Sequence, residues 1–440
     1  MNARGVALAV ARDVFALDRP QRRAQEALEY RLRSEKLDDR DRAFVTQVAY
    51  GSIKMRRTIE YFLDPYVGGR DKPLPPTIAE ILRLATYELK FLRSKAHGVV
   101  SEYVQLAKQY GHRGTAALVN AVLRSLLRDD PQLPDAHLFE DRADYLGVRF
   151  SFPTWIVRSF METFASESIE TILAGLNESP QSAICVNTLR VPVDDVARRL
   201  TSEGWAPRRS AFVEETLLVD RDGPRREGED AKGEWVTQSE AAAMPVDIAN
   251  PQPGEAILDV CSGRGNKALQ SAARLSGSGT LTCVERDARK AELLARRLEA
   301  AGATAAILTG DATQPILPGQ FDRAIVDAPC SGLGILGRHP EARWRKTPAD
   351  AARLAHVQTA LLESIAPHVY PGGALVYAVC STDARETVDR VEGFLRRHNF
   401  SRGLVPSRYE PFLTEDGDVL VPPGIDGRDG FFISRLERAT

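Results

Sequence analysis

Residues 256–270 read AILDVCSGRGNKALQ, an apolar run that leads through a turn with two glycines into a helical pattern. A short apolar run that ends at a glycine-containing turn is typical of a buried strand. The same alternation continues toward the C-terminus, with further strands expected at 281–284, 305–308, 323–326 and 374–379 and helices at 288–300 and 351–365. Strands that alternate with helices in this way form a parallel, doubly wound sheet. From about residue 246 onward, the sequence therefore predicts an α/β fold.

The N-terminal part of the chain has a different pattern. In residues 1–135 apolar side chains recur at helical spacing, Asp39 marks one expected helix start, and no catalytic constellation is present, so we expect an all-α bundle. Residues 136–245 mix helical runs with strand-like runs at 183–189 and 216–219, and we expect a small α+β domain there. Their charged stretch, 220–232, is an expected exposed loop. The expected domains are thus 1–135, 136–245 and 246–440.

Composition excludes several classes of protein. Of the 440 residues 43% are hydrophobic and 27% charged, as in an ordinary soluble protein, and no apolar run is long enough to predict a membrane helix. The 5 cysteines, from Cys185 to Cys380, fit neither a disulfide framework nor a metal site, which favours a reducing cytoplasm. The formal net charge of −2 does not by itself indicate a nucleic-acid ligand, although a local basic surface is enough to bind phosphates. We expect a monomer, and solvated surface at arginine clusters such as Arg343 and Arg345.

Polar residues follow the first three predicted strands. In an open α/β sheet, ligands bind beyond the carboxyl ends of the strands. The turn after the first strand contains glycines, which let the backbone approach a ligand closely, and the second strand ends in Glu285, whose carboxylate can accept hydrogen bonds from both hydroxyls of a ribose. Asp311 follows the third strand. These residues predict a nucleoside-binding edge, but residues 263–268 also satisfy the dinucleotide fingerprint, so a nicotinamide-dependent dehydrogenase remains an alternative at this point.

Two cysteines follow the fourth and fifth predicted strands. Residues 327–334 read DAPCSGLG and residues 379–382 read VCST, so Cys330 and Cys380 come at the ligand-facing ends of neighbouring strands. A single buried cysteine is usually only a small hydrophobic residue. Two that face one crevice, one of them near Asp327, indicate a chemical role instead, and a dehydrogenase does not explain them.

The order of these motifs resembles that of the RsmB/Sun-type RNA (cytosine-5)-methyltransferases over essentially the whole chain. The specific elements are DAPCSGLG and the Cys380-Ser381 pair. Supporting matches are SFPTW at 151–155, VNTLR at 186–190, QSEA at 238–241, RWR at 343–345 and DGFFI at 429–433. The helical N-terminal part is similar to a NusB-like RNA-binding domain, a likeness carried by Tyr50-Gly51 and by VNAVLR at 119–124.

This resemblance implies a class I, Rossmann-like methyltransferase domain that uses S-adenosylmethionine to methylate carbon 5 of a cytosine in RNA. Carbon 5 is a poor nucleophile, and a thiolate that adds to carbon 6 makes it reactive. By resemblance Cys380 is that thiolate, Asp327 hydrogen-bonds the base near N3 and N4, and Cys330 assists release of the enzyme by elimination. The base must leave any helical stack to reach these groups. The implied substrate is small-subunit (16S) ribosomal RNA, with transfer RNA as an alternative.

The resemblance also implies a set of cofactor-binding residues, namely Asp259, Cys261, Ser262, Gly263, Gly265, Lys267, Glu285, Asp311 and Asp327. Lys267 would bind the carboxylate of the methionine moiety or would only begin a helix. The chain departs from the family pattern in its first loop, where Arg264 replaces a proline and Asn266 a glycine, and after Cys380, where Glu386 alone remains of a Glu-Asn-Glu cluster. These departures keep open a second hypothesis, a non-catalytic RNA-binding or ribosome assembly factor on a methyltransferase scaffold.

Overall fold

The computed structural model describes residues 1–17, 20–68, 73–92, 94–219 and 233–440. The chain forms two compact units, one made of Met1–Arg158 and Arg338–Lys346 and the other of Ser159–Gly337 and Thr347–Thr440. The short segment Arg338–Lys346, which follows the DAPCSGLG motif in sequence, thus packs with the N-terminal helices.

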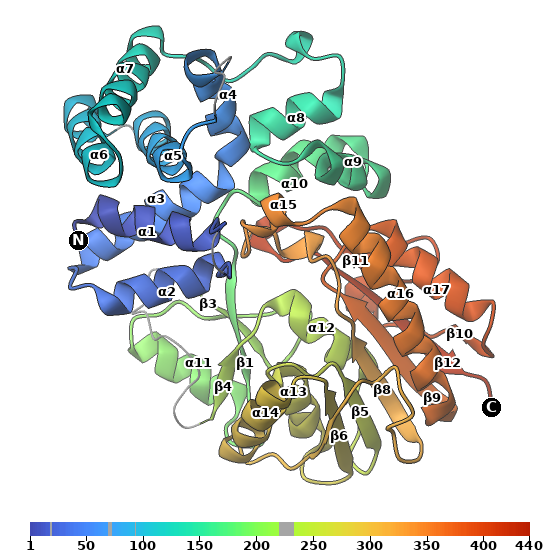
Figure 1. Ribbon diagram of the computed structural model, residues 1–440. Helices are drawn as coiled ribbons and strands as arrows, with labels where there is room; N and C mark the ends of the chain where they lie inside the picture. The colour runs from blue at the N-terminus through green and yellow to red at the C-terminus, as the bar shows by residue number, and fades with distance from the viewer. Residues whose placement is uncertain (18–19, 69–72, 93, 220–232) are drawn as a thin grey trace. The chain divides into compact units, whose positions relative to one another are not determined.

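The first unit is helical, as the sequence predicts (Figure 1). Its helices are α1 (Ala3–Val14), α2 (Ala24–Ser34), α3 (Asp39–Lys54), α4 (Arg56–Val67), α5 (Pro76–Lys90), α6 (Ala96–Tyr110), α7 (Arg113–Asp129), α8 (Arg142–Phe150) and α15 (Ala342–Arg345). Helix α3 begins at Asp39 as expected, and the carboxylate of Asp38 caps it by accepting a hydrogen bond from the backbone nitrogen of Asp41 at 2.7 Å. The expected apolar stripes of α5 and α7 lie in one buried core.

The prediction that the arginine clusters are exposed to solvent is wrong for Arg343. Its side chain is fully buried in the first unit, where the guanidinium lies 3.8 Å from the ring centre of Phe152. It also donates hydrogen bonds to the carbonyl oxygens of Lys54, at 3.4 Å, and Ser151, at 3.3 Å. Ring stacking and backbone acceptors replace the water that an arginine normally needs. A charge pattern in the sequence cannot reveal such a pocket.

A small antiparallel sheet belongs to the second unit. Helices α9 (Thr154–Thr163) and α10 (Ile169–Gly175) precede it in the chain. The strands β1 (Ser182–Val186), β2 (Arg208–Arg209), β3 (Thr216–Val219) and β4 (Trp235–Thr237) follow the order β2-β3-β1-β4, with α11 (Val193–Ser202) after β1. The structure shortens the predicted run 183–189 because the chain turns at the buried Asn187, whose side-chain nitrogen donates to the carbonyl oxygens of Gly233 and Ala301. The predicted loop 220–232 lies outside the described residues.

The large sheet has the predicted doubly wound core. Its parallel strands are β5 (Ala256–Val260), β6 (Thr280–Glu285), β7 (Ala306–Thr309), β8 (Phe321–Asp327) and β9 (Val369–Val379). The sequence pattern does not predict β10 (Phe400–Arg402), β11 (Val419–Val421) and β12 (Phe431–Arg438), which continue the sheet in antiparallel orientation. The order is β10-β12-β9-β8-β5-β6-β7, so the winding reverses between β5 and β8. A ligand site of a doubly wound sheet lies at this reversal.

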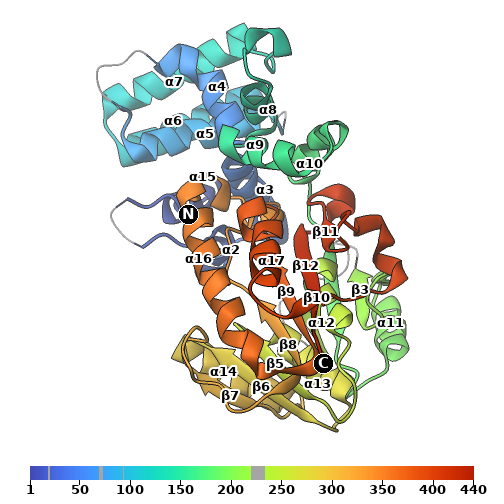
Figure 2. The same ribbon diagram turned by 90° about the vertical axis from the view of Figure 1, so that its right-hand side faces the viewer.

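Helices cover both faces of the sheet (Figure 2). They are α12 (Glu240–Ala249), α13 (Asn266–Leu275) and α14 (Ala288–Ala300) on one face and α16 (Pro348–Ile365) and α17 (Val388–Leu395) on the other. Adjacent residues of β5 divide between the two cores: Ile257 packs with α13 and α14, whereas Leu258 packs with α16. Burial on both faces explains why these strands appear in the sequence as continuous apolar runs.

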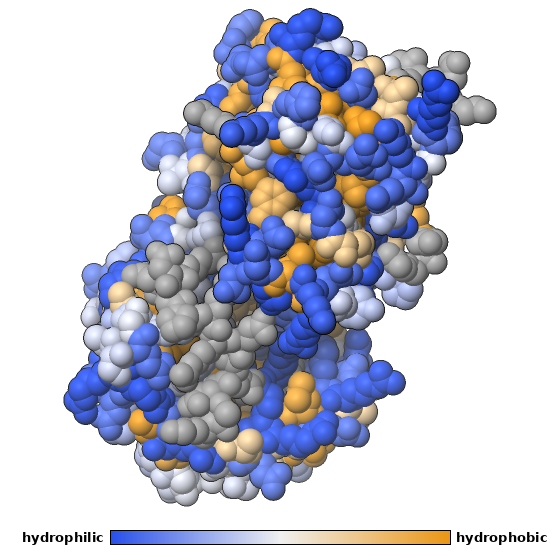
Figure 3. All heavy atoms as spheres, turned by 90° about the vertical axis from the view of Figure 1, so that its left-hand side faces the viewer, coloured by the Kyte–Doolittle hydropathy of each residue, from blue (hydrophilic) through white to orange (hydrophobic). Residues whose placement is uncertain are grey.

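Figure 3 shows a face of the molecule on which hydrophobic side chains are scattered among hydrophilic ones. Within the described residues, no helix has the length and apolar character needed to cross a membrane.

Candidate functional site

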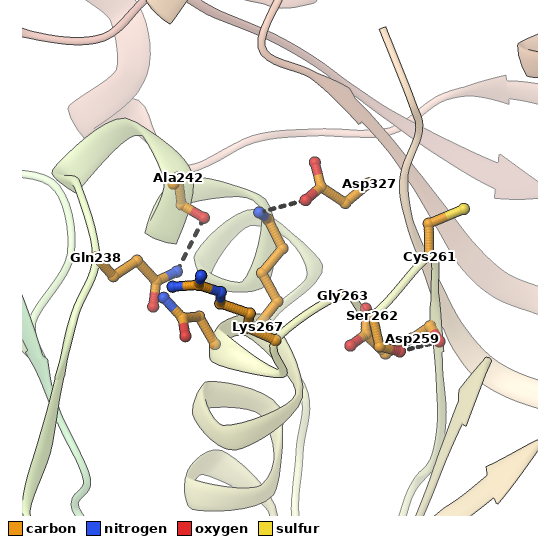
Figure 4. Close-up of a pocket in the computed structure, with 10 residues that line it drawn as sticks. Gln238, Ala242, Asp259, Cys261, Ser262, Gly263, Lys267 and Asp327 are labelled. Carbon is orange, nitrogen blue, oxygen red and sulfur yellow. Dashed lines mark hydrogen bonds and ion pairs between the residues drawn. The ribbon is translucent and has the colours of Figure 1, made fainter. Parts of the chain in front are cut away.

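A pocket lies where the winding of the large sheet reverses, between the ends of β5 and β8 and the start of α13 (Figure 4). Six of the nine predicted cofactor residues line it, together with four others: Gln238, Ala242, Asp259, Cys261, Ser262, Gly263, Arg264, Asn266, Lys267 and Asp327. Gly265, Glu285 and Asp311 lie outside this lining. The sequence thus locates the pocket, while Gln238 and Ala242, contributed from before and within α12, were not predicted.

The turn after β5 has an unusual backbone. Cys261, Gly263 and Gly265 have positive φ angles of 62°, 58° and 85°. This conformation is costly for a residue with a side chain, and such residues concentrate at functional sites. At Gly265 a side chain is also excluded by contact, because an added Cβ would lie 2.3 Å from Leu294 Cδ1. The turn therefore places the first amides of α13 beside the pocket.

Glu285 supports this turn from the end of β6. Its Oε2 accepts a hydrogen bond from the backbone nitrogen of Gly263 at 2.9 Å, and its Oε1 accepts one from that of Asp287, also at 2.9 Å. Asp311, after β7, accepts hydrogen bonds from the backbone nitrogen and hydroxyl of Thr313, and these bonds lower its pKa. Both carboxylates are held in fixed positions at the edge of the sheet.

Asp259 has a buried carboxylate at the pocket. It is fully inaccessible, and within the described part of the chain neither carboxylate oxygen has a hydrogen-bond partner. Burial raises its pKa to about 7, against the opposing effects of the Lys267 charge and the nearby Ser262 hydroxyl. That hydroxyl donates to the backbone carbonyl oxygen of Asp259 at 2.9 Å. Buried polar atoms are nearly always hydrogen-bonded in proteins. An unsatisfied carboxylate in a pocket therefore fits a ligand that brings a cationic donor.

Lys267 connects the pocket to β8. Its ammonium nitrogen lies 2.8 Å from Asp327 Oδ2 (Figure 4). The same nitrogen lies 5.5 Å from the ring centre of Phe431. Lys267 lies in the first turn of α13, which agrees with the sequence-based alternative that it begins a helix. Its ion pair with Asp327 was not foreseen. This pair joins a predicted cofactor residue to a predicted catalytic one.

The two cysteines meet. Cys330 Sγ and Cys380 Sγ lie 3.3 Å apart, as expected for the ends of the adjacent strands β8 and β9. Both residues are partly accessible. The pKa of Cys330 is well above its ordinary value because of the hydrogen bond with Cys380 and because of burial. The loops are also joined where the backbone nitrogen of Gly334 donates to the carbonyl oxygen of Cys380 at 3.0 Å.

Side-chain contacts accommodate one departure in the first loop, that at Asn266. The side chain of Asn266 donates to the carbonyl oxygen of Thr237 at 3.0 Å and accepts from Arg297 Nη2 at 3.0 Å. Arg297 also donates to the carbonyl oxygen of Arg264. Sequence reasoning missed Arg297, which comes from α14 and has no motif around it.

The described residues contain no group of three or more His, Cys, Asp or Glu side chains that could hold a metal ion.

Comparison with known proteins assigns each part of the chain to a family. Residues 246–437 match the model of the 16S rRNA methyltransferases RsmB/F. Residues 1–128 match the NusB family, and residues 152–225 match the ferredoxin-like domain of RsmF/B-like methyltransferases. The helical N-terminal domain, the small linking domain and the Rossmann-like methyltransferase domain predicted from the sequence are therefore all present.

Relatives match the full length of the chain. A probable ribosomal RNA small subunit methyltransferase B of Synechocystis sp. is 32% identical and is covered, like this chain, over 100% of its length. The ribosomal RNA small subunit methyltransferase B of Thermus thermophilus is 32% identical over 94% of each chain. A crystal structure of PH0851, 23% identical, has the same fold with a TM-score of 0.82 over 100% of this chain and 99% of that one. NSun6 from Pyrococcus horikoshii, solved with SFG, matches 66% of this chain and 99% of its own with a TM-score of 0.58 and 17% identity. The chain belongs to the RsmB/F family of ribosomal RNA small subunit methyltransferases.

Proposed function

We propose that this protein methylates carbon 5 of a cytosine in 16S ribosomal RNA, with S-adenosylmethionine as the methyl donor and Cys380 as a covalent nucleophile. The observation that carries the proposal is the 3.3 Å separation of the Cys330 and Cys380 sulfurs beside the pocket residue Asp327. Methyl transfer to a ribose hydroxyl or to an exocyclic nitrogen needs no thiol. Carbon 5 of cytosine needs one, because only addition to carbon 6 makes it nucleophilic.

The contact between the two sulfurs supports a shared role for the two thiols. By the family resemblance Cys380 is the one that would act as the thiolate, which is the reactive form of a cysteine. Its addition forms the bond from Sγ to carbon 6 and moves the electron pair of the ring double bond toward carbon 5. Once carbon 5 carries the methyl group, a base would take its proton, the freed electron pair would re-form the ring double bond, and Sγ would leave carbon 6 as a thiolate. Cys330 lies close enough to Cys380 to assist this release.

Asp327 would hold the target base. Its Oδ2 is fixed by the ammonium of Lys267 at 2.8 Å, so the carboxyl group keeps one orientation. Hydrogen bonds from this group to the N3 and N4 edge of cytosine would stabilise the charge that develops on the ring.

The pocket fits S-adenosylmethionine. The Asp259 carboxylate, which has no hydrogen-bond partner among the described residues, would accept from its ammonium group, and Arg264 brings positive charge for its carboxylate. Glu285, at the end of β6 and outside the pocket lining, is assigned to the ribose hydroxyls by the sequence pattern and the family resemblance alone. Asp311 borders the same edge of the sheet. When bound, S-adenosylmethionine supplies an electrophilic methyl group on a positively charged sulfur.

The test is methylation of unmodified 16S ribosomal RNA by the full-length protein, read out as 5-methylcytosine by mass spectrometry. Cys380→Ala should abolish the product. Cys330→Ala should accumulate a covalent protein–RNA adduct, because release is impaired after addition. If 5-methylcytosine forms in transfer RNA but not in 16S RNA, transfer RNA is the substrate instead of 16S RNA.

A non-catalytic assembly factor is the second candidate, favoured by the altered first loop. This second candidate predicts that the protein binds RNA but neither binds S-adenosylmethionine nor forms 5-methylcytosine. Calorimetric titration with S-adenosylmethionine separates the two: no binding, together with no methylation of either RNA, would establish the scaffold hypothesis.

A further inference from the structure

Glu386 is a fully buried carboxylate between the two cysteine loops. Its Oε1 accepts a hydrogen bond from the backbone nitrogen of Ser331 at 2.8 Å. Its Oε2 accepts hydrogen bonds from the hydroxyls of Ser331 and Ser381, the second at 2.6 Å. Ser331 directly follows Cys330 in the chain, and Ser381 directly follows Cys380. One carboxylate thus binds the immediate neighbours of both cysteines.

Two further buried side chains complete this cluster. The amide nitrogen of Gln358 donates to Glu386 Oε1 at 3.1 Å and to the carbonyl oxygen of Pro329 at 3.0 Å. Polar groups on both sides of Cys330 are therefore anchored. The hydroxyl of Tyr377 donates to the backbone carbonyl oxygen of Glu386 at 2.6 Å. Gln358 and Tyr377 are fully inaccessible, so water cannot replace these bonds without rearrangement.

We propose that Glu386 is a positioning residue for the methyl-transfer reaction: its carboxylate holds the Cys330 loop against the Cys380 loop and so fixes the distance between the two sulfurs. The positioning role matters for catalysis only if the proposed function holds, whereas the contacts of Glu386 with the two loops do not depend on that function. Four donors converge on this carboxylate, and its removal leaves the buried backbone nitrogen of Ser331 without this acceptor. The amide of Gln358 would keep only its bond to Pro329, and the hydroxyls of Ser331 and Ser381 would keep only their 3.0 Å contact with each other. The backbone bond from Gly334 to Cys380 joins the loops as well, but it does not reach Ser331 or Ser381.

The charge of Glu386 has a second effect. It is one of the causes that raise the pKa of Cys330, after the hydrogen bond with Cys380, burial and the charge of Cys380. A neutral side chain of the same shape would separate the two effects. In Glu386→Gln the oxygen can keep the bonds from Ser331 and Gln358, and the new amide can donate to the serine hydroxyls, which also accept.

The first experiment compares Glu386→Ala with the wild-type protein. Methyl transfer at saturating cofactor should fall about 100-fold, the scale of an error of about 1 Å in the position of reacting groups. Cofactor affinity by calorimetry should stay the same, because Glu386 does not line the pocket. Disulfide formation between Cys330 and Cys380 reports the sulfur distance directly: two thiols and one hydrogen peroxide give the disulfide and two waters. Its rate, from peptide mass spectrometry, should fall in the variant.

The second experiment measures alkylation of Cys330 by iodoacetamide as a function of pH. Glu386→Gln should move this profile to lower pH, and a purely structural role would leave it unchanged. Glu363→Gln is the matched control, because Glu363 belongs to α16 and pairs with Arg397 and His398 rather than with the cysteine loops. It should behave as the wild type in every assay.

These measurements separate the possible failures. An unchanged disulfide rate in folded Glu386→Ala would overturn the positioning role. If Glu386→Ala does not fold, the disulfide rate of Glu386→Asp decides, because its shorter side chain cannot reach the donors of both loops: a slower rate supports the proposal and an unchanged rate overturns it. A wild-type protein that methylates no RNA would refute the proposed function, and the two thiol measurements would still decide the role of Glu386.

Discussion

Replacing Asp259 with asparagine should stabilise the cofactor-free protein at alkaline pH while weakening cofactor binding. Asp259 is fully buried, has no hydrogen-bond partner for its carboxylate among the described residues, and has a pKa raised to about 7 by burial. Its ionisation is therefore unfavourable in the folded protein and easy in the unfolded chain. Asparagine has nearly the same shape and never ionises.

The size of this change in the free energy of unfolding follows from the pKa of Asp259 in the folded and unfolded protein. The ordinary value is 3.8 and the folded value about 7. Because the folded value is raised, the contribution of the protonated group to stability is complete below pH 3.8 and is lost as the pH rises through about 7. At about 1.4 kcal/mol for each tenfold difference in proton affinity, the whole loss is at most about 4 kcal/mol. The asparagine variant avoids this loss, so its advantage should grow between pH 5 and pH 8.

Thermal unfolding of both proteins without cofactor, at several pH values in this range, measures the effect. The difference between the two proteins at each pH cancels the other titrating groups, and each kcal/mol corresponds to about 2–4 °C for a unit of this size. Asp311→Asn is the control, because the pKa of Asp311 is lowered and its replacement should bring no alkaline gain. Calorimetry at pH 8 should show S-adenosylmethionine binding to Asp259→Asn about tenfold or more weakly, since a charged acceptor is lost. An Asp259→Asn difference that is the same at pH 5 and pH 8 would refute the reasoning.

Three further changes test other parts of the structure. Gly265→Ala should destabilise the second unit by about 1–3 kcal/mol in thermal unfolding, because its Cβ meets a leucine methyl at 2.3 Å and φ is +85°; Gly263→Ala, with no contact under 3.8 Å, should cost less. Lys267→Met should lower single-turnover methyl transfer about tenfold or more, because Asp327, which we propose to hold the base, loses its ammonium partner, and Lys267→Arg should retain part of the activity. Arg343→Ala should destabilise the first unit by about 3 kcal/mol, measured by hydrogen exchange of its helices, because it leaves a cavity and unpaired carbonyls; exchange like that of the wild type would contradict this.

Sequence patterns predicted most of the parallel core because local physics decides it. Helix α14 has the predicted bounds 288–300, where an apolar stripe and the Asp287 cap agree. Strand β5 (256–260) likewise lies where the apolar run begins in the sequence, since burial on both faces leaves a run that is apolar except at Asp259. Strands β10 and β11 have three residues each, too short for any periodicity to distinguish them from loop. Their pairing with β12 is a long-range contact that the local sequence does not encode.

The site, like the fold, has features that the local sequence predicts and features that only long-range contacts create. Parallel strands share an edge, so the meeting of Cys330 and Cys380 could be predicted from strand order alone. The ion pair between Lys267 and Asp327 could not, because it depends on how far a helix side chain reaches across to a strand 60 residues away. Glu386 was noticed only as a remnant of a cluster. Its role becomes visible when four donors converge on it in three dimensions.

The substitutions in the first loop were the main argument for a non-catalytic scaffold, and the contacts of the Asn266 side chain weaken it. Asn266, in place of a glycine, is held by Thr237 and Arg297, and Arg297 also binds the backbone at Arg264. The positive φ angles of the turn are kept, so the amides of α13 still border the pocket. A scaffold has no use for an unsatisfied buried carboxylate at Asp259, since such a group only lowers stability without a ligand. Nor does a scaffold need two sulfurs 3.3 Å apart with a buried carboxylate tying their loops together. An unsatisfied buried carboxylate and two adjacent thiols are instead expected in a methyltransferase, whose cofactor and substrate would interact with these groups when bound.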